Sequence, residues 1–96
     1  QASRIVSDRE SVADALRGLL GRGLEVVYPS QANFVLVKVS AQGAAVAQRM
    51  RDSGVLIKDV GRMHPTLADC LRLTVGTAEE NRQMLEALTQ ALAAIR

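Results

Sequence analysis

Apolar and polar residues alternate along several short stretches of the chain, which is the pattern of strands in a half-buried sheet. In residues 70–75, apolar residues alternate with Arg72 and Thr74. Residues 33–39 are apolar at almost every position, as in a strand that is covered on both faces. Residues 55–60 form a third stretch of this kind. The pattern therefore predicts three strands.

Apolar residues recur every three or four positions along three other stretches, which predicts amphipathic helices over residues 3–21, 41–53 and 78–95. Ser40 can cap the start of the second helix, and Gly54 fits the left-handed position after its end. The apolar positions are Ile5, Val12, Leu16, Leu19 and Leu20 in the first helix, Ala44, Val46, Ala47 and Met50 in the second, and Met84, Leu85, Leu88, Ala91, Leu92 and Ile95 in the third.

The start of the first helix has two readings. Ser7 and Glu10 have the spacing of a capping box, which would start the helix late and leave the first residues loose. Alternatively, the helix runs straight through from Ser3. Its end is clearer, because Gly21 and Gly23 follow the last apolar positions.

The order of the elements predicts the fold class. Residues 24–28 are apolar but short and end at Pro29, which cannot donate to a ladder, so we expect at most an edge strand there. The order α-β-α-β-β-α then predicts an α/β (α+β) two-layer fold with a small, mostly antiparallel sheet of about three strands and the helices mainly on one face. We expect the strands of Asn33 and Arg72 to pair antiparallel, with the strand of Val55 in the same sheet.

The composition is that of one small globular domain spanning residues 1–96. Hydrophobic residues make up 48%, but only Tyr28 and Phe34 are aromatic, so the core must be built mainly from aliphatic side chains. The 12 lysines and arginines barely outnumber the 10 acidic residues and are scattered along the chain. A nucleic-acid surface concentrates basic residues and adds stacking aromatics, so we expect no nucleic-acid partner.

Cys70 is the only cysteine, which rules out an intrachain disulfide and favours the reducing cytoplasm. A free cysteine at the start of a strand is typical of a small buried hydrophobe. No apolar run is long enough to span a bilayer, and no Cys and His residues have metal-ligand spacing. We therefore expect a cytoplasmic protein without a metal site or membrane contact.

The candidate chemistry lies where the last strand meets the last helix. Gly76 ends the strand, and Thr77 to Glu80 has the T-x-x-E spacing of a capping box. Arg72 would thus be a planar, permanently charged fork on a rigid strand, suited to a carboxylate or a phosphate. From the residues alone, the alternative is an arginine on an exposed or ion-paired sheet face.

No complete catalytic motif is present, since the chain has neither a Gly-rich phosphate loop nor a nucleophile elbow. Lys38 and Lys58 are interpreted as solvated strand charges, and His64 as an exposed loop residue beside proline. Asp59 and Asp69 flank that loop and are expected to cap it or to face water. The residues alone assign no catalytic side chain.

Three motifs follow one another along the chain. They are Pro29-Ser30-Gln31-Ala32-Asn33-Phe34, Gly54-Val55-Leu56-Ile57-Lys58-Asp59, and Cys70-Leu71-Arg72-Leu73-Thr74-Val75-Gly76-Thr77 with Glu79-Glu80-Asn81. In this order and at this spacing they resemble the C-terminal domain of histidinol-phosphate aminotransferase, a class II member of the fold-type I pyridoxal-phosphate aminotransferases. The resemblance covers nearly the whole chain from Ser3 onwards, and the last motif is the most specific.

The resemblance implies transfer of an amino group between histidinol phosphate and 2-oxoglutarate in histidine biosynthesis. Arg72 matches the family arginine that receives the α-carboxylate of glutamate and the phosphate end of histidinol phosphate. Lys58 matches a position where relatives often carry a second basic residue, commonly arginine, near the phosphate. Lysine keeps the charge of that position but lacks the planar fork.

The family's Schiff-base lysine and most of its pyridoxal phosphate site belong to a large upstream domain, whose motifs this chain lacks. We therefore expect the chain alone to bind no cofactor and to be inactive. The full-length enzyme is expected to use pyridoxal phosphate and to form a homodimer. The two-sided apolar strand at 34–39 indicates that a missing partner covers part of the sheet. The alternative is a stand-alone regulatory module that binds an amino acid or another anion through Arg72.

Overall fold

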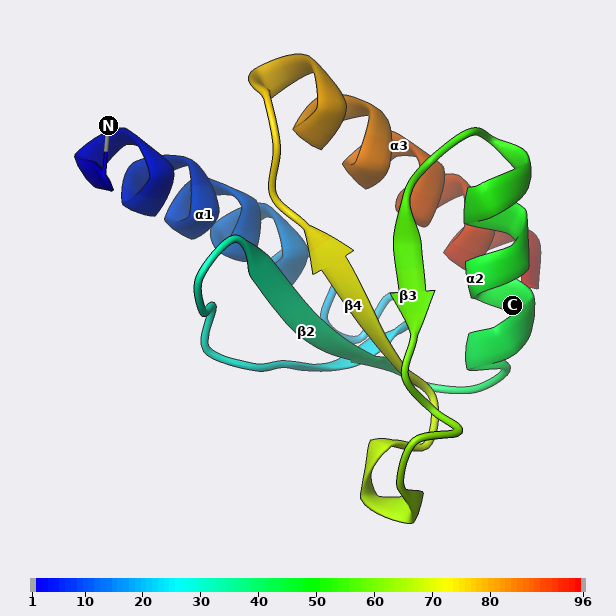
Figure 1. Ribbon diagram of the computed structural model, residues 1–96. Coiled ribbons are helices and arrows are strands. Elements are labelled where there is room, and N and C mark those ends of the chain that lie inside the picture. The colour runs from blue at the N-terminus through cyan, green and yellow to red at the C-terminus, as the bar shows by residue number, and fades with distance from the viewer. Residues whose placement is uncertain (1, 96) are drawn as a thin grey trace.

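The computed structural model describes the backbone of residues 2–95 and the side chains of residues 8–95, and this part of the chain forms three α-helices and one four-stranded sheet (Figure 1). The helices are α1 (Ala2–Arg17), α2 (Gly43–Asp52) and α3 (Ala78–Ile95). The strands are β1 (Leu24–Val27), β2 (Phe34–Val39), β3 (Ile57–Asp59) and β4 (Cys70–Thr74), and a 3-10 turn, η1, spans Pro65–Leu67.

All neighbouring strands are antiparallel, and their order across the sheet is β1-β2-β4-β3. In the central pair, Val35 of β2 faces Leu73 of β4, and Val37 faces Leu71. The predicted antiparallel pairing of the Asn33 and Arg72 strands is therefore confirmed, as is the placement of β3 in the same sheet. Two central strands thus hold the middle of the fold, with β1 and β3 at the edges.

The expectation of about three strands, and of the order α-β-α-β-β-α, was wrong by one element. β1 is a fourth strand that pairs with the free edge of β2, so the order becomes α-β-β-α-β-β-α. It is only four residues long, and its register shifts between Leu24 and Val26, so its apolar residues show no clean alternation. The edge of β2 stabilises a segment whose own pattern is weak.

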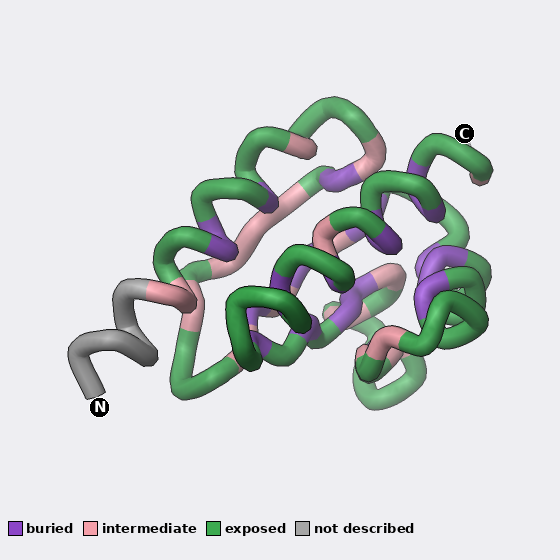
Figure 2. Tube along the Cα trace, turned by 90° about the horizontal axis from the view of Figure 1, so that it is seen from above, coloured by how far each residue is buried: buried purple, intermediate pink, exposed green. Residues whose placement is uncertain are grey.

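The hydrophobic core lies between the sheet and the helices, and all three helices contribute to it. Buried positions recur along the inward side of each helix, with exposed positions on the opposite side (Figure 2). The predicted packing of the helices on one face of the sheet is therefore confirmed. The core includes Val12 and Leu16 of α1, Val46 and Met50 of α2, Met84, Leu88 and Leu92 of α3, and Val35, Val37, Val39, Leu71 and Leu73 of the sheet.

The first helix runs continuously through Ser7, so the straight-through reading is correct and the late start is not. It ends at Arg17, four residues before the predicted end, because the chain turns at Gly18. The side chain of Ile5, which was expected on the apolar stripe, lies outside the described residues. No helix within residues 2–95 is long and apolar enough to cross a membrane.

The predicted N-cap of α2 at Ser40 is wrong. The helix begins at Gly43, after Gln42 in a left-handed conformation with φ 59°. The backbone N–H of Gly43 donates instead to Oδ1 of Asp69 over 2.9 Å, so a residue 26 positions later caps the helix. At the other end Gly54, with φ 85°, occupies the predicted left-handed position, and Val55 N donates to Met50 O.

Candidate functional site

Arg72 lies on the side of the sheet opposite the helices, which we call the outer face. Its two neighbours on β4, Leu71 and Leu73, are fully buried in the core, whereas Arg72 is exposed. This is the alternation that the sequence predicted. The strand is central in the sheet and is paired on both sides, so the Cα of Arg72 is fixed by ladders to β2 and β3.

Lys58 stands directly opposite Arg72 across the β3–β4 pair. Side chains that are paired in register in an antiparallel ladder share a face and lie close together, so the structure brings the two predicted site residues side by side. Both are exposed. Among the side chains of residues 8–95, none provides a carboxylate partner for Lys58 or Arg72. Two like charges therefore face each other with no compensating acid in the part of the chain whose side chains are described.

The other cation of the central sheet is compensated. Lys38 of β2 forms an ion pair of 3.2 Å with Glu25 of β1. The hydrogen bond that the Lys38 ammonium group donates to Glu25, and then the negative charge of Glu25, raise the pKa of Lys38 above its ordinary value. Lys38 is therefore a strand charge as expected, but it is paired with an acid on β1, the stretch for which at most an edge strand was expected.

An aromatic ring approaches Arg72 from the neighbouring strand. The guanidinium carbon of Arg72 lies 5.5 Å from the centroid of the Phe34 ring, within the range of a cation–π contact. In the β2–β4 register Phe34 is paired with Thr74, and Arg72 with Leu36, so the ring and the cation are diagonal neighbours on the outer face. Phe34 and Leu36 are both half-buried.

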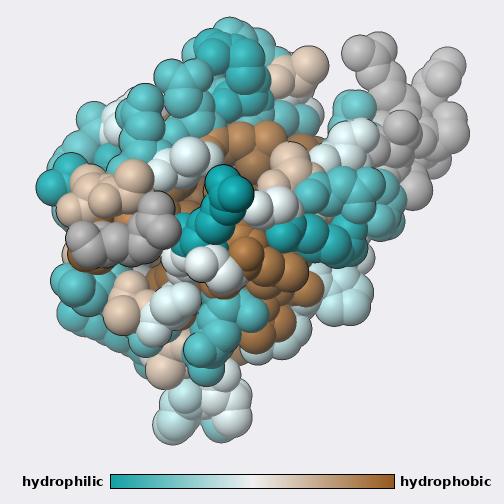
Figure 3. Space-filling view, turned by 180° about the vertical axis from the view of Figure 1, so that it is seen from behind, coloured by the Kyte–Doolittle hydropathy of each residue, from teal (hydrophilic) through white to brown (hydrophobic). Residues whose placement is uncertain are grey.

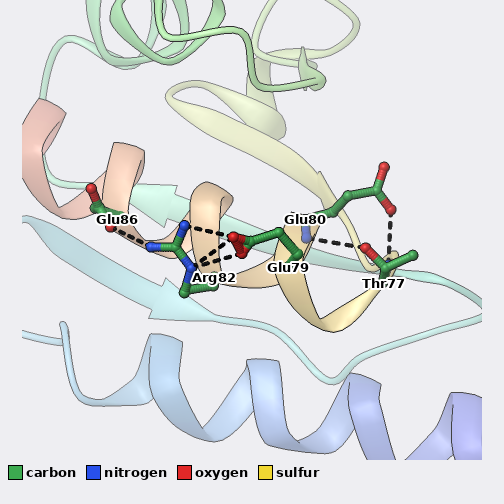
Figure 4. Close-up of polar contacts among 5 residues, drawn as sticks. All are labelled: Thr77, Glu79, Glu80, Arg82 and Glu86. Atoms are coloured by element: carbon green, nitrogen blue, oxygen red, sulfur yellow. Dashed lines mark hydrogen bonds and ion pairs between the residues drawn. The ribbon is translucent and has the colours of Figure 1, made fainter.

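The turn from β4 into α3 is held by the predicted capping box (Figure 4). The N–H of Thr77 donates to Oε1 of Glu80 over 2.9 Å, and the N–H of Glu80 donates to the hydroxyl oxygen of Thr77 over 3.1 Å. The hydrogen bond that the Thr77 backbone N–H donates to the Glu80 carboxylate, and then the interaction of that carboxylate with the Thr77 side chain, lower the pKa of the Glu80 carboxyl group below its ordinary value. A Cβ on Gly76 would meet the carboxylate end of the Glu80 side chain, which would then have to move from its capping position.

Asn81 closes the same turn from inside the helix. It is nearly buried, its Oδ1 accepts from Gly76 N over 2.8 Å, and its amide nitrogen donates to Gly76 O over 3.2 Å. No structural role was predicted for Asn81 from the sequence. The asparagine five residues after the strand-ending glycine could have indicated a side chain that hydrogen-bonds to the turn. Figure 4 also shows Arg82 of this helix bound to both Glu79 and Glu86.

The loop between β3 and β4 holds the remaining candidates. Asp59 accepts from Gly61 N and thus caps the loop as expected, whereas Asp69 caps α2 instead. His64 is exposed, and its Nδ1 accepts from Thr66 N at the start of η1, which is a structural role.

Cys70 is fully buried, and burial raises the pKa of its thiol. No cluster of potential metal ligands occurs in the described part of the chain.

No protein-family model matches the chain. It is 45% identical over 92 residues to histidinol-phosphate aminotransferase 2 of Cupriavidus pinatubonensis, a match that covers 96% of the chain and 24% of that protein. It is 47% identical over 88 residues to histidinol-phosphate aminotransferase of Methylibium petroleiphilum, covering 92% of the chain and 23% of that protein. The chain is homologous to the C-terminal end of histidinol-phosphate aminotransferases.

A solved structure agrees with this homology. The fold superposes on a Burkholderia pseudomallei crystal structure assigned as an aminotransferase, with a TM-score of 0.75 and 36% sequence identity. That match covers 94% of this chain and 26% of the other. The chain thus spans about a quarter of the length of the histidinol-phosphate aminotransferases that it matches.

Proposed function

We propose that this chain is the C-terminal, substrate-contacting domain of a pyridoxal-phosphate-dependent aminotransferase that moves an amino group between histidinol phosphate and 2-oxoglutarate. The observation that carries the proposal is the pair of exposed cations, Arg72 and Lys58, that face each other with no acidic partner among residues 8–95. Like charges directly opposite each other destabilise a sheet, and a bound anion between them removes that repulsion.

Within this proposal Arg72 receives the α-carboxylate of glutamate and the phosphate end of histidinol phosphate. A guanidinium matches either anion with two parallel N–H···O bonds, and each of its donors is free of other described side chains. Lys58 adds a point charge at the phosphate end. Neither residue breaks a bond or moves a proton, so both hold and orient the substrate.

Pyridoxal phosphate supplies the electron sink and the amino carrier of this chemistry, and we propose that its site lies in the part of the longer enzyme that this chain does not cover. Lys38 is ion-paired with Glu25, and Lys58 is exposed beside Arg72, so neither lysine is proposed as the Schiff-base residue.

The longer protein is proposed to be a cytoplasmic homodimer whose large domain meets the outer face of the sheet. The buried, unpaired thiol of Cys70 suits a reducing compartment. The half-buried Phe34 and Leu36 leave apolar surface on that face for a covering domain. The alternative of a stand-alone anion-binding regulatory module lacks support, because the homologues contain this segment as a quarter of a longer enzyme.

The proposal is tested by assaying amino transfer from histidinol phosphate to 2-oxoglutarate with the 96-residue chain and with the protein that includes the preceding segment. The longer protein is expected to turn over both substrates and the chain alone neither. Turnover by the chain alone would contradict the assignment of the catalytic parts to the preceding segment. A cofactor-loaded longer protein that does not accept histidinol phosphate would contradict the proposed substrate.

A further inference from the structure

Phe34 restrains the guanidinium of Arg72 without neutralising it. An acidic partner would occupy two of the five N–H donors of an arginine and cancel its charge. An aromatic face attracts the cation through its quadrupole and leaves the in-plane N–H donors free. The ring of Phe34 is the described group that contacts the Arg72 guanidinium, at 5.5 Å from the ring centroid.

Three other arginines of the described part of the chain are held differently. Arg82 is bound by two carboxylates, and Arg17 by Asp14. Arg9 donates to a backbone carbonyl, that of Ala32, over 2.7 Å. In each of these cases the restraint consumes hydrogen-bond donors. Arg72 alone among these four is positioned by a group that takes none.

The ring is itself carried on a fixed segment. Phe34 exchanges two backbone hydrogen bonds with Gln31, and the carbonyl of the preceding Asn33 accepts from Val75 N over 2.7 Å. The turn before it is tied to α1, because Arg9 binds Ala32 O. Phe34 therefore has little freedom to move away from the cation. The chain contains one phenylalanine, and the fold places it beside Arg72.

We propose that Phe34 is a positioning residue, whose ring holds the guanidinium of Arg72 over the outer face in the orientation that receives the substrate anion. This inference rests on the proposed function. An arginine side chain loses much rotamer freedom when it binds a ligand, and a cation held in place beforehand loses less. The contact should therefore strengthen anion binding by about three- to tenfold.

The test compares Phe34→Leu, which keeps an apolar side chain but has no ring, with Phe34→Tyr, which keeps the ring. In the cofactor-loaded full-length enzyme, Phe34→Leu should raise KM for glutamate and for histidinol phosphate by about three- to tenfold, with kcat within about twofold, because uniform binding is lost. Phe34→Tyr should restore wild-type KM. Leu36→Val, on the same strand and facing Arg72 in register, is the matched control and should leave KM unchanged.

Three outcomes would overturn the inference: an unchanged KM in Phe34→Leu, an equal defect in Phe34→Tyr, or an equal defect in Leu36→Val. Arg72→Ala separates this inference from the proposed function. If Arg72→Ala abolishes activity while Phe34→Leu leaves KM unchanged, the positioning role falls and the function stands. If Arg72→Ala has normal kinetics with both substrates, the proposed role of Arg72 fails and that of Phe34 fails with it.

Discussion

Lys58 and Arg72 occupy directly opposed positions on β3 and β4, and each projects a positive charge from the same face of the sheet. The repulsion between them is a cost to the isolated fold, because opposed like charges destabilise an antiparallel pair. The same arrangement favours an anion that bridges both groups. The pair of positive charges therefore lowers the stability of the isolated fold but strengthens the binding of an anion.

Replacing Lys58 by glutamate should therefore raise stability and weaken anion binding. The introduced carboxylate would face Arg72 as an opposite charge, so the free energy of unfolding should rise by roughly 0.2–1 kcal/mol. The same change should lower kcat/KM for histidinol phosphate in the full-length enzyme by more than about tenfold, because a negative charge then faces the phosphate. Urea unfolding and steady-state kinetics measure the two effects.

Lys58→Gln is the matched control, since it removes the repulsion without adding an ion pair. It should show a smaller gain in stability and a smaller loss in kcat/KM than Lys58→Glu. A loss of stability in Lys58→Glu would show that the two side chains do not interact as their register predicts. Unchanged kinetics in both variants would remove Lys58 from the proposed site.

Arg72→Lys tests the planar fork directly. Lysine retains the charge but cannot form two parallel hydrogen bonds to a carboxylate or phosphate. A hydrogen bond to a charged group contributes roughly 1.5–3 kcal/mol, so kcat/KM in the full-length enzyme should fall by about ten- to a hundredfold. Arg72→Ala should cost more. Stability should change little in either variant, because Leu71 and Leu73 carry the core contacts of the strand.

Near-normal kinetics of Arg72→Lys with both glutamate and histidinol phosphate would reduce Arg72 to a charge on a sheet face. A melting curve of each variant shows whether the substitution damages the fold. If activity and stability fell together, the kinetic loss would follow from that damage and not from lost substrate binding. Binding of pyridoxal phosphate, followed by its absorbance, should be unaffected, because the proposed cofactor site lies outside this chain.

The elements that the sequence predicted best are those whose local signals agree. In β4 the alternation, the strand-ending glycine and the capping box all indicate one geometry, and the structure has it. The alternation also predicted that Arg72 projects away from the core. The pairing partner of Arg72 could not be read from the same signals, because register depends on how separate strands align.

The predictions that were wrong or incomplete have a common cause, because each depends on contacts between residues far apart in the sequence. α2 begins at Gly43 because Asp69, far along the chain, caps it, and no local pattern marks that bond. β1 forms because β2 offers it an edge, although its own four residues are weakly patterned. The contact between Phe34 and Arg72 likewise depends on strand register. Sequence patterns indicated which side chains project from the sheet, and tertiary pairing decided which of them meet.

The capping box should make stability depend on pH. The hydrogen bonds from Thr77 lower the folded-state pKa of Glu80, so its contribution is complete above the ordinary glutamate pKa, about 4.3, and is lost as the pH falls through the lowered folded value. Glu80→Gln keeps the acceptor but cannot titrate, so its stability should fall less steeply below about pH 5 than that of the wild type. Urea unfolding as a function of pH measures the slope.

Thr77→Ala is the companion variant, and it should lower the free energy of unfolding at neutral pH by about 1 kcal/mol, the usual cost of losing an N-cap side chain. Glu79, whose pKa is lowered by Arg82, titrates in all three proteins and so provides a constant background. An acid slope in Glu80→Gln identical to that of the wild type would mean that the Glu80 carboxylate does not stabilise the helix start.

The isolated 96-residue chain should self-associate or bind a hydrophobic dye. Leu56 is 85% exposed and Met63 is 64% exposed, and hydrophobic side chains also reach the surface within a rim of hydrophilic ones in the view of Figure 3. A surface of this kind is typical of a domain that lacks its partner. Leu56→Ser should reduce dye fluorescence, and a monodisperse monomer without dye binding at high concentration would contradict the prediction.

Gly43→Ala should destabilise the fold by about 1–3 kcal/mol, because an added Cβ would lie 2.8 Å from the Cα of Asp69 and the two segments cannot both stay in place. Gln42→Gly is the matched control on the neighbouring residue. Gln42 has a left-handed φ of 59°, which glycine adopts without strain, so this variant should be neutral or slightly stabilising. Urea unfolding measures both variants. If Gly43→Ala is destabilised and Gln42→Gly is not, the close approach of Asp69 to Gly43 is the reason that this position needs glycine.

If Gly43→Ala were as stable as the wild type, the contact between α2 and the start of β4 would be loose, and Asp69 would not fix the strand that carries Arg72.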